Sequence, residues 1–169
     1  MKKSLSGVLF IVGLLPLLWG CPYEAKVPLG EGSKAPFDAA LVGEWKNTEQ
    51  GESFTMTIQQ FNEHEFLISG AEIKKGTCEC EAMRAFVTMV NDERFLNVQE
   101  IKGQSEVRGW WIAKYIISGD TLTAWVVEDK LFTEPLTSSR ALYRFIKKNL
   151  HNKELYGDAS PMVLQRIAK

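Results

Sequence analysis

The sequence predicts a mainly β protein: an eight-stranded antiparallel meander barrel with one α-helix before the last strand. Three observations carry this prediction. Turn-forming residues recur about every ten positions from Leu41 onward, as they do between short strands. Apolar and polar residues alternate over residues 54–58 (FTMTI), and the apolar spacing becomes helical after Pro135.

The strands follow from the turns that separate them. Turn signals occur at Asn47 to Gly51, Asn62-Glu63, Lys75-Gly76, Asn91-Asp92, Lys102 to Ser105 and Gly119-Asp120. Around these turns we expect eight strands, near residues 41–46, 53–61, 64–74, 77–90, 94–102, 108–118, 121–128 and 162–168. The length of the chain, 169 residues, suits one domain.

Two of the turns predict which residues share a sheet face, because directly opposed residues lie on the same side. With two-residue turns at Asn62-Glu63 and Lys75-Gly76, one face is mostly apolar and the other mostly polar. The apolar face carries Phe54, Met56, Ile58, Leu67, Ala71, Ile73, Cys78 and Cys80. Two independent turn predictions thus give one apolar and one polar face, which supports both turns.

The Gly119-Asp120 turn predicts a second apolar face. It carries Trp111, Tyr115, Ile117, Leu122, Ala124 and Val126, whereas Trp125 lies on the opposite face with Lys114 and Ile116. An eight-stranded barrel can hold one small ligand or fill itself with side chains. Aromatic residues commonly pack in cores without a ligand, so both interpretations stay open. The candidate ligand-lining residues are Phe54, Met56, Trp111 and Tyr115.

The helix is predicted after Pro135. Ala141, Leu142, Phe145, Ile146 and Leu150 follow helical spacing. Ser138 or Ser139 can cap its first turn, and Lys147 and Lys148 near its end complement the helix dipole.

The N-terminus has the pattern of a secretory signal peptide over residues 1–20. Lys2 and Lys3 precede a mostly apolar run from Leu5 to Trp19. This run is shorter than the roughly 20 apolar residues of a spanning helix, and Pro16 interrupts it. Proline and glycine punctuate the next segment, so we expect residues 21–40 to be a flexible tether and residues 41–169 to form the barrel domain.

Leu18-Trp19-Gly20-Cys21 resembles the lipobox of bacterial lipoproteins, although Trp19 stands where that motif has a small residue. The resemblance implies that Cys21 carries a diacylglyceryl group and, after cleavage before it, often a further acyl chain such as palmitate. It also implies a lipid-anchored protein of the cell envelope. Residue 22, which follows the cysteine, is proline and not aspartate. In Gram-negative lipoproteins this resemblance favours the outer membrane over retention in the inner membrane. The alternative is a chance cysteine after an uncleaved or differently cleaved signal.

Gly43-Glu44-Trp45 on the first predicted strand, with eight meandering strands, resembles the lipocalin-like barrels. In that superfamily an arginine of the last strand covers the tryptophan near the closed barrel end. The resemblance assigns this role to Arg166, with Arg144 as second candidate, and implies a small apolar ligand. A helix before the last strand differs from secreted lipocalins and is closer to small bacterial lipocalin-like domains.

Cys78 and Cys80 leave three alternatives: small buried thiols, a strained local disulfide, or a metal site. Neighbours on one face of a strand lie near the upper distance limit for a disulfide. A zinc site needs more ligands, and neither histidine is near in the predicted register, so we expect no metal. His64 beside Glu63 and Glu65 is predicted to be a solvated turn.

Composition narrows the function further. The net charge is -1 and no block of basic residues occurs, so we expect no nucleic-acid partner. The motifs of hydrolases, zinc peptidases and phosphate-binding loops are absent, so we expect no catalytic residues, no cofactor and no enzyme activity. The sequence therefore predicts a ligand-binding barrel on a lipid anchor. The alternative is an envelope interaction or structural module with a solid core and a protein partner.

Overall fold

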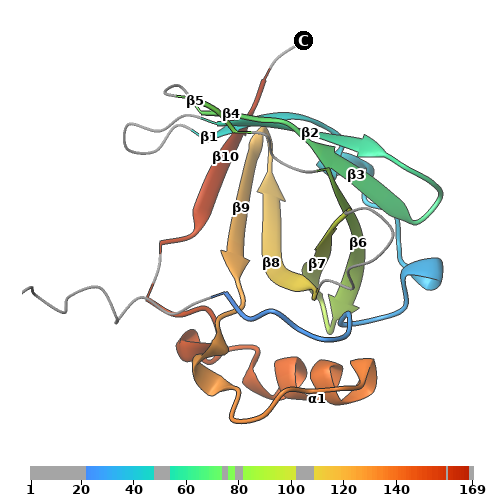
Figure 1. Ribbon diagram of the computed structural model, residues 1–169, viewed down its shortest axis with the longest axis vertical. Coiled ribbons are helices and arrows are strands. Elements are labelled where there is room, and N and C mark those ends of the chain that lie inside the picture. Colours follow the sequence, from blue (N-terminus) through green and yellow to red (C-terminus); the bar gives the residue numbers. More distant parts are fainter. Residues whose placement is uncertain are drawn as a thin grey trace, which may run out of the picture.

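The computed structural model describes residues 22–47, 54–73, 76–78, 82–101, 109–158 and 160–167. Eight antiparallel strands close into a barrel, and a single α-helix of the described chain, α1 (Ser139–Asn149), precedes the last of them (Figure 1). The predicted fold class is therefore confirmed.

The barrel strands follow one another around the wall as a meander. They are β1 (Gly43–Asn47), β2 (Thr55–Gln60), β3 (Glu65–Ser69), β6 (Met83–Val90), β7 (Glu93–Glu100), β8 (Trp111–Ser118), β9 (Thr121–Val126) and β10 (Met162–Arg166), and β10 pairs with β1 to close the ring. Between β3 and β6, β4 (Ala71–Ile73) and β5 (Gly76–Cys78) form a separate two-stranded sheet. Short 3₁₀ helices are η1 (Gly32–Lys34), η2 (Ala39–Leu41), η3 (Asp129–Leu131) and η4 (Lys153–Leu155).

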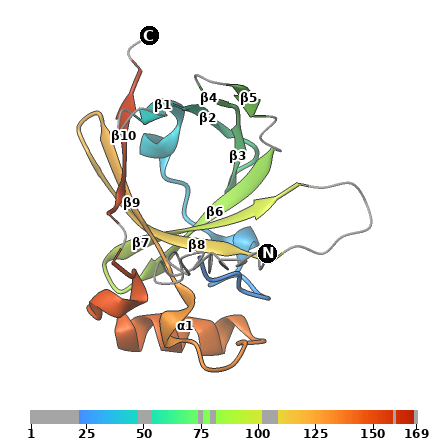
Figure 2. The same cartoon turned by 60° about the vertical axis from the view of Figure 1, so that its left-hand side comes forward.

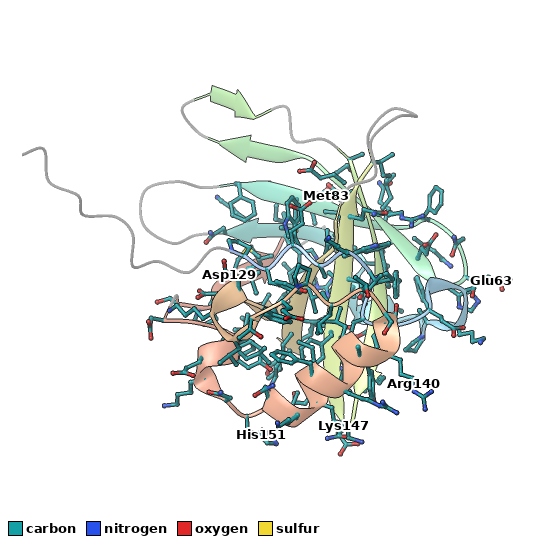
Figure 3. The ribbon with its side chains drawn as sticks, turned by 60° about the horizontal axis from the view of Figure 1, so that its bottom comes forward. Glu63, Met83, Asp129, Arg140, Lys147 and His151 are labelled. Atoms are coloured by element: carbon teal, nitrogen blue, oxygen red, sulfur yellow. The ribbon has the colours of Figure 1, made fainter. Side chains whose placement is uncertain are left out.

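Both faces of the β6–β8 wall are apolar and buried, which gives the protein two cores. The inner core fills part of the barrel and contains Trp45, Ile58, Phe66 and Ile68 among others. The outer core lies on the opposite face of the wall, where alternate residues such as Phe86, Phe95 and Ile112 meet α1. Leu142 and Ile146 of α1 are fully buried there, whereas Arg140, Lys147 and His151 project away from the barrel (Figure 3).

An N-terminal strap, defined here as residues 22–36, runs between the barrel wall and α1 (Figures 1 and 2). Its backbone pairs with the wall: the Tyr23 N–H donates to the Val127 carbonyl at 2.9 Å, and Ala25 exchanges hydrogen bonds with Trp110 at 2.9 and 2.7 Å. The buried Asn97 side chain accepts from the Leu29 N–H at 2.7 Å. The strap is therefore an integral layer of the outer core.

The prediction of a flexible tether over residues 21–40 is thus wrong for residues 22–40. Tyr23, Ala25 and Leu29 are buried, because they alternate with exposed residues and present one apolar edge to the barrel. The residues after the strap continue into the fold: Phe37 stacks on Phe66, with ring centroids 4.8 Å apart. The folded domain begins by residue 22 and not near residue 41.

The predicted strands differ from the structure in three details. The strand expected near 77–90 is divided into β5, in the separate sheet, and β6, in the barrel. The strand expected near 64–74 breaks at Gly70, whose φ of +77° turns the chain out of the barrel between β3 and β4. The β2–β3 turn spans three residues and not two, because the Asn62 side chain accepts from the N–H groups of His64 and Glu65. This slip of one residue pairs Ile58 with Ile68, so Leu67 moves to the outer face of the barrel.

Candidate ligand cavity

A cavity of about 310 Å³ lies inside the barrel. Inward-facing side chains from all eight barrel strands except β1, together with η2 and the first described residue, form its wall. The lining residues are Pro22, Leu41, Met56, Ile58, Ile68, Met83, Leu96, Val98, Trp111, Ala113, Tyr115, Leu122, Ala124, Val126, Met162 and Leu164. The wall is apolar apart from the Tyr115 hydroxyl.

The cavity extends toward one end of the barrel, which we call the open end. At this end β6 begins at Met83, β8 begins at Trp111, β10 begins at Met162 and β9 ends at Val126. These four residues line the cavity and are only partly buried. Deeper lining residues such as Leu41 and Ile58 are buried. The graded burial places the mouth of the cavity at the open end.

The opposite, closed end is formed by Trp45, which is fully buried. Its indole N–H donates to the Leu41 carbonyl at 2.8 Å. The guanidinium carbon of Arg166 lies 4.2 Å from the centre of the Trp45 ring, which confirms the predicted pairing with Arg166 and not with Arg144. This is a favourable cation–π geometry.

Arg166 also ties η2 to the barrel. Its two terminal nitrogens donate to the carbonyls of Val42 and Ala40, each at 2.7 Å. Gly43 makes room for this guanidinium, because a Cβ at residue 43 would lie 2.6 Å from Arg166 Nη1. Gly43 also has a φ of +146°, which side chains rarely adopt. The Gly-x-Trp motif is therefore explained by one steric arrangement. The Arg166 guanidinium covers the Trp45 ring, and Gly43 leaves the space that this guanidinium needs.

The single polar group at the cavity wall has a partner. The Tyr115 hydroxyl donates to Asp38 Oδ2 at 2.8 Å, and the same carboxylate lies 3.7 Å from Arg94 Nε. Burial, with a smaller contribution from the hydrogen bond to Asp38, raises the pKa of Tyr115 far above its usual range. The hydroxyl therefore stays protonated and leaves the cavity without a free polar group on the described wall.

Of the four residues predicted to line a ligand site, Met56, Trp111 and Tyr115 line this cavity. The fourth, Phe54, packs against the inner core but does not line the cavity. The β8–β9 register is also confirmed, since Tyr115 pairs with Ala124 and Ile117 with Leu122.

The lining residues of β7 went unpredicted. Leu96 and Val98 face the cavity, but Phe95 and Asn97 between and beside them are buried on the other face. A strand that is buried on both faces loses the alternation that marks an inward-facing set. A correct β7–β8 register would have identified them, because directly opposed residues share a face: Leu96 pairs with Ala113, and Val98 pairs with Trp111.

The cysteine predictions remain open. A two-residue turn at Lys75-Gly76, as predicted, would pair Ile73 with Cys78. The structure instead pairs Cys78 with Ala71 and Ile73 with Gly76 across the β4–β5 hairpin, so the predicted register is wrong. Cys80 and the predicted lipidation site Cys21 lie outside the described residues. Within the described part of the chain, no group of three or more His, Cys, Asp or Glu side chains is arranged to hold a metal ion.

His64 contributes to the fold through the strap. One nitrogen of its ring lies 2.8 Å from the Ala35 carbonyl, so the turn between β2 and β3 holds the end of the strap. A depression of about 370 Å³ beside it and another of about 500 Å³ beside η1 are shallower than the barrel cavity and are lined partly by charged side chains. The barrel cavity is more enclosed and more apolar than either depression.

Comparisons with protein families, with curated proteins and with solved structures found no match to this chain. No helix among the described residues is long and apolar enough to cross a membrane.

Proposed function

We propose that this protein is an exported, lipid-anchored envelope lipoprotein whose barrel binds one small apolar ligand. The observation that carries the proposal is the cavity of about 310 Å³ with its apolar wall. Ligand pockets are typically concave, mostly apolar and at least about 300 Å³ in volume. The proposal assigns the protein no catalysed reaction.

The cavity is also what favours this function over a solid-core interaction module. A core packed for stability alone leaves few voids larger than a water molecule. Here Ala113 and Ala124 stand on neighbouring strands where larger side chains would fill the space. Because the wall offers no free polar group, the expected ligand is an uncharged hydrocarbon or the hydrocarbon tail of a larger molecule.

The anchor is supported by the sequence pattern at residues 18–21. Each buried methylene of an acyl chain contributes roughly 0.8 kcal/mol to membrane binding, and stable anchoring takes two signals. Two or three acyl chains on Cys21 would satisfy that requirement.

The ligand is tested by mass spectrometry of organic extracts from protein purified after expression in bacteria. We expect a bound apolar molecule in near-stoichiometric amount. Ala113→Phe should remove most of it by filling the cavity, whereas Ile116→Phe, an exposed position on the same strand, should leave it unchanged. Wild-type protein without ligand, or equal loss in both variants, would contradict the proposal.

The anchor is tested separately. Cys21→Ser should move the protein from the detergent phase to the aqueous phase in phase separation, or leave it as an uncleaved precursor. A variant that still partitions and is cleaved like the wild type would show that Cys21 carries no lipid.

A further inference from the structure

We infer that the open end of the barrel lies on the lipid bilayer, with the mouth of the cavity facing the membrane. This inference rests on the proposed function, since it takes Cys21 as the lipidated residue. It concerns an orientation that the anchor alone does not specify, and three features of the structure lead to it.

The first feature is the absence of a spacer. The isolated bridge between Pro22 and Glu128 and the hydrogen bond from the Tyr23 N–H to Val127 fix the chain to the barrel from residue 22. Consecutive Cα atoms are about 3.8 Å apart, so a lipid on Cys21 starts within one residue of the barrel surface. A flexible tether of about 20 residues would instead average about 25 Å from end to end.

The second feature is where that attachment lies. Pro22 is exposed and at the same time lines the cavity, next to the end of β9. The strap pairs with Trp110 and Glu128, which lie just before β8 and just after β9. Trp111 and Val126, the adjacent strand ends, line the mouth. The anchor point and the mouth of the cavity therefore share one edge of the barrel. The strap begins beside the end of β9 (Figure 1).

The third feature is the chemistry of this end. Ile101, which directly follows β7 at the open end, is 46% exposed, and its N–H is paired with the Ala82 carbonyl. The mouth itself is lined by Met83, Trp111 and Met162, whereas Glu24 and Glu100 line a separate depression on the other side of Trp111. Apolar and tryptophan side chains are the groups that favour the boundary between lipid headgroups and acyl chains.

The basic outer face of α1 is the competing surface for an anionic bilayer. Arg140, Arg144, Lys147 and Lys148 are exposed on it. However, the strap lies under α1, and a helix with its side chains is about 10 Å thick. A lipid attached one residue before Pro22 does not span that layer, so the anchor favours the open end.

The experiment compares three labelled positions in full-length, lipidated protein reconstituted in phosphatidylethanolamine–phosphatidylglycerol vesicles. In a Cys78→Ala, Cys80→Ala background, a fluorescent dye is attached to Ile101→Cys at the open end, Phe61→Cys at the closed end or Lys147→Cys on α1. Phe61 is 60% exposed and is the matched control for Ile101. Quenching by lipids that carry a nitroxide near the headgroup reports which position meets the bilayer.

We expect the dye at residue 101 to lose most of its emission and the dyes at residues 61 and 147 to keep most of theirs. A flexible Gly/Ser spacer of about 20 residues between Cys21 and Pro22 should abolish the difference while the protein stays on the vesicles. Equal or stronger quenching at residue 61 or 147, or no effect of the spacer, would overturn the orientation and leave the anchor intact. Protein that fails to associate with vesicles would overturn both.

Discussion

The guanidinium of Arg166 lies directly over the ring of Trp45, and the two residues are also cross-strand partners between β10 and β1. The two residues thus connect the first and last barrel strands in two ways: through the backbone pairing of β1 with β10 and through the contact between their side chains. The same guanidinium holds the Ala40 and Val42 carbonyls at the closed end.

Trp45→Ala should lower the free energy of unfolding by roughly 3–5 kcal/mol, because it removes a fully buried aromatic ring and the surface that Arg166 covers. Urea unfolding of the full-length protein measures this loss. Trp125→Ala is the control, since Trp125 is only partly buried on the outer face. Similar losses for the two variants would show that the closed end does not depend on the Trp45 contact.

Gly43→Ala should destabilise the protein by about 2 kcal/mol or more, through backbone strain of order 1–3 kcal/mol and the displacement of Arg166. Gly119→Ala is the matched control, because it also has a positive φ (+58°) but nothing lies within 4 Å of its Cβ position. Combining Gly43→Ala with Arg166→Ala should cost less than the sum of the single changes. Simple additivity would mean that the two residues do not compete for space.

Asn97→Ala should release the strap. The Asn97 amide accepts from Leu29 and donates to the Phe86 carbonyl at 3.2 Å, so truncation leaves buried backbone groups without partners and costs about 1–3 kcal/mol. Hydrogen exchange at the Leu29 amide should accelerate more than exchange in β8. Gln99→Ala, two residues along the same strand, should change neither property much; unchanged Leu29 protection in Asn97→Ala would contradict this role.

Stability should fall as the pH rises from about 10 to about 12. Burial, with the nearby charge of Glu93, raises the pKa of Tyr156 to about 12, and the pKa of Tyr115 is raised as well. A tyrosine has a pKa near 10 in the unfolded chain, so the folded state holds its protons more tightly. This contribution is complete below pH 10 and is lost above it.

The double variant Tyr115→Phe, Tyr156→Phe should therefore show a shallower decline over this pH range in urea unfolding at each pH. Ionisation of lysines acts on both proteins alike and supplies the common background. A slope identical to that of the wild type would exclude the two tyrosines as its source.

The parts of the fold that could be predicted are those in which local pattern and turn chemistry agree. The Gly119-Asp120 turn leaves one register for β8 and β9, and the structure has that register. At Asn62 the side chain builds its own turn and adds one residue to the loop, which the residue types alone do not show. The candidate lining residues were taken from strands with one apolar and one polar face. The lining residues of β7 were missed because β7 has buried residues on both faces.

The strap was missed for a different reason. Its prolines and glycines correctly indicate a segment without a long helix or strand, since it contains isolated bridges, bends and η1. What they do not indicate is that Tyr23, Ala25, Leu29 and Ala35 are buried. Burial depends on partners far along the sequence, since Leu29 binds Asn97 and the Tyr23 hydroxyl accepts from the Leu136 N–H, 68 and 113 residues away. No local window contains both members of such a pair.

The same separation sets the order in which the molecule can be completed. A chain emerges from synthesis or from an export channel with its N-terminus first, yet the strap has nothing to pack against until β7, β9 and α1 have followed it. Under the proposed function, the stretch beside Cys21 would stay accessible to a processing peptidase and to acyl transfer for most of that passage. Docking of the strap against the outer core would then fix the proposed anchor point, so that maturation and the end of folding would be consecutive events.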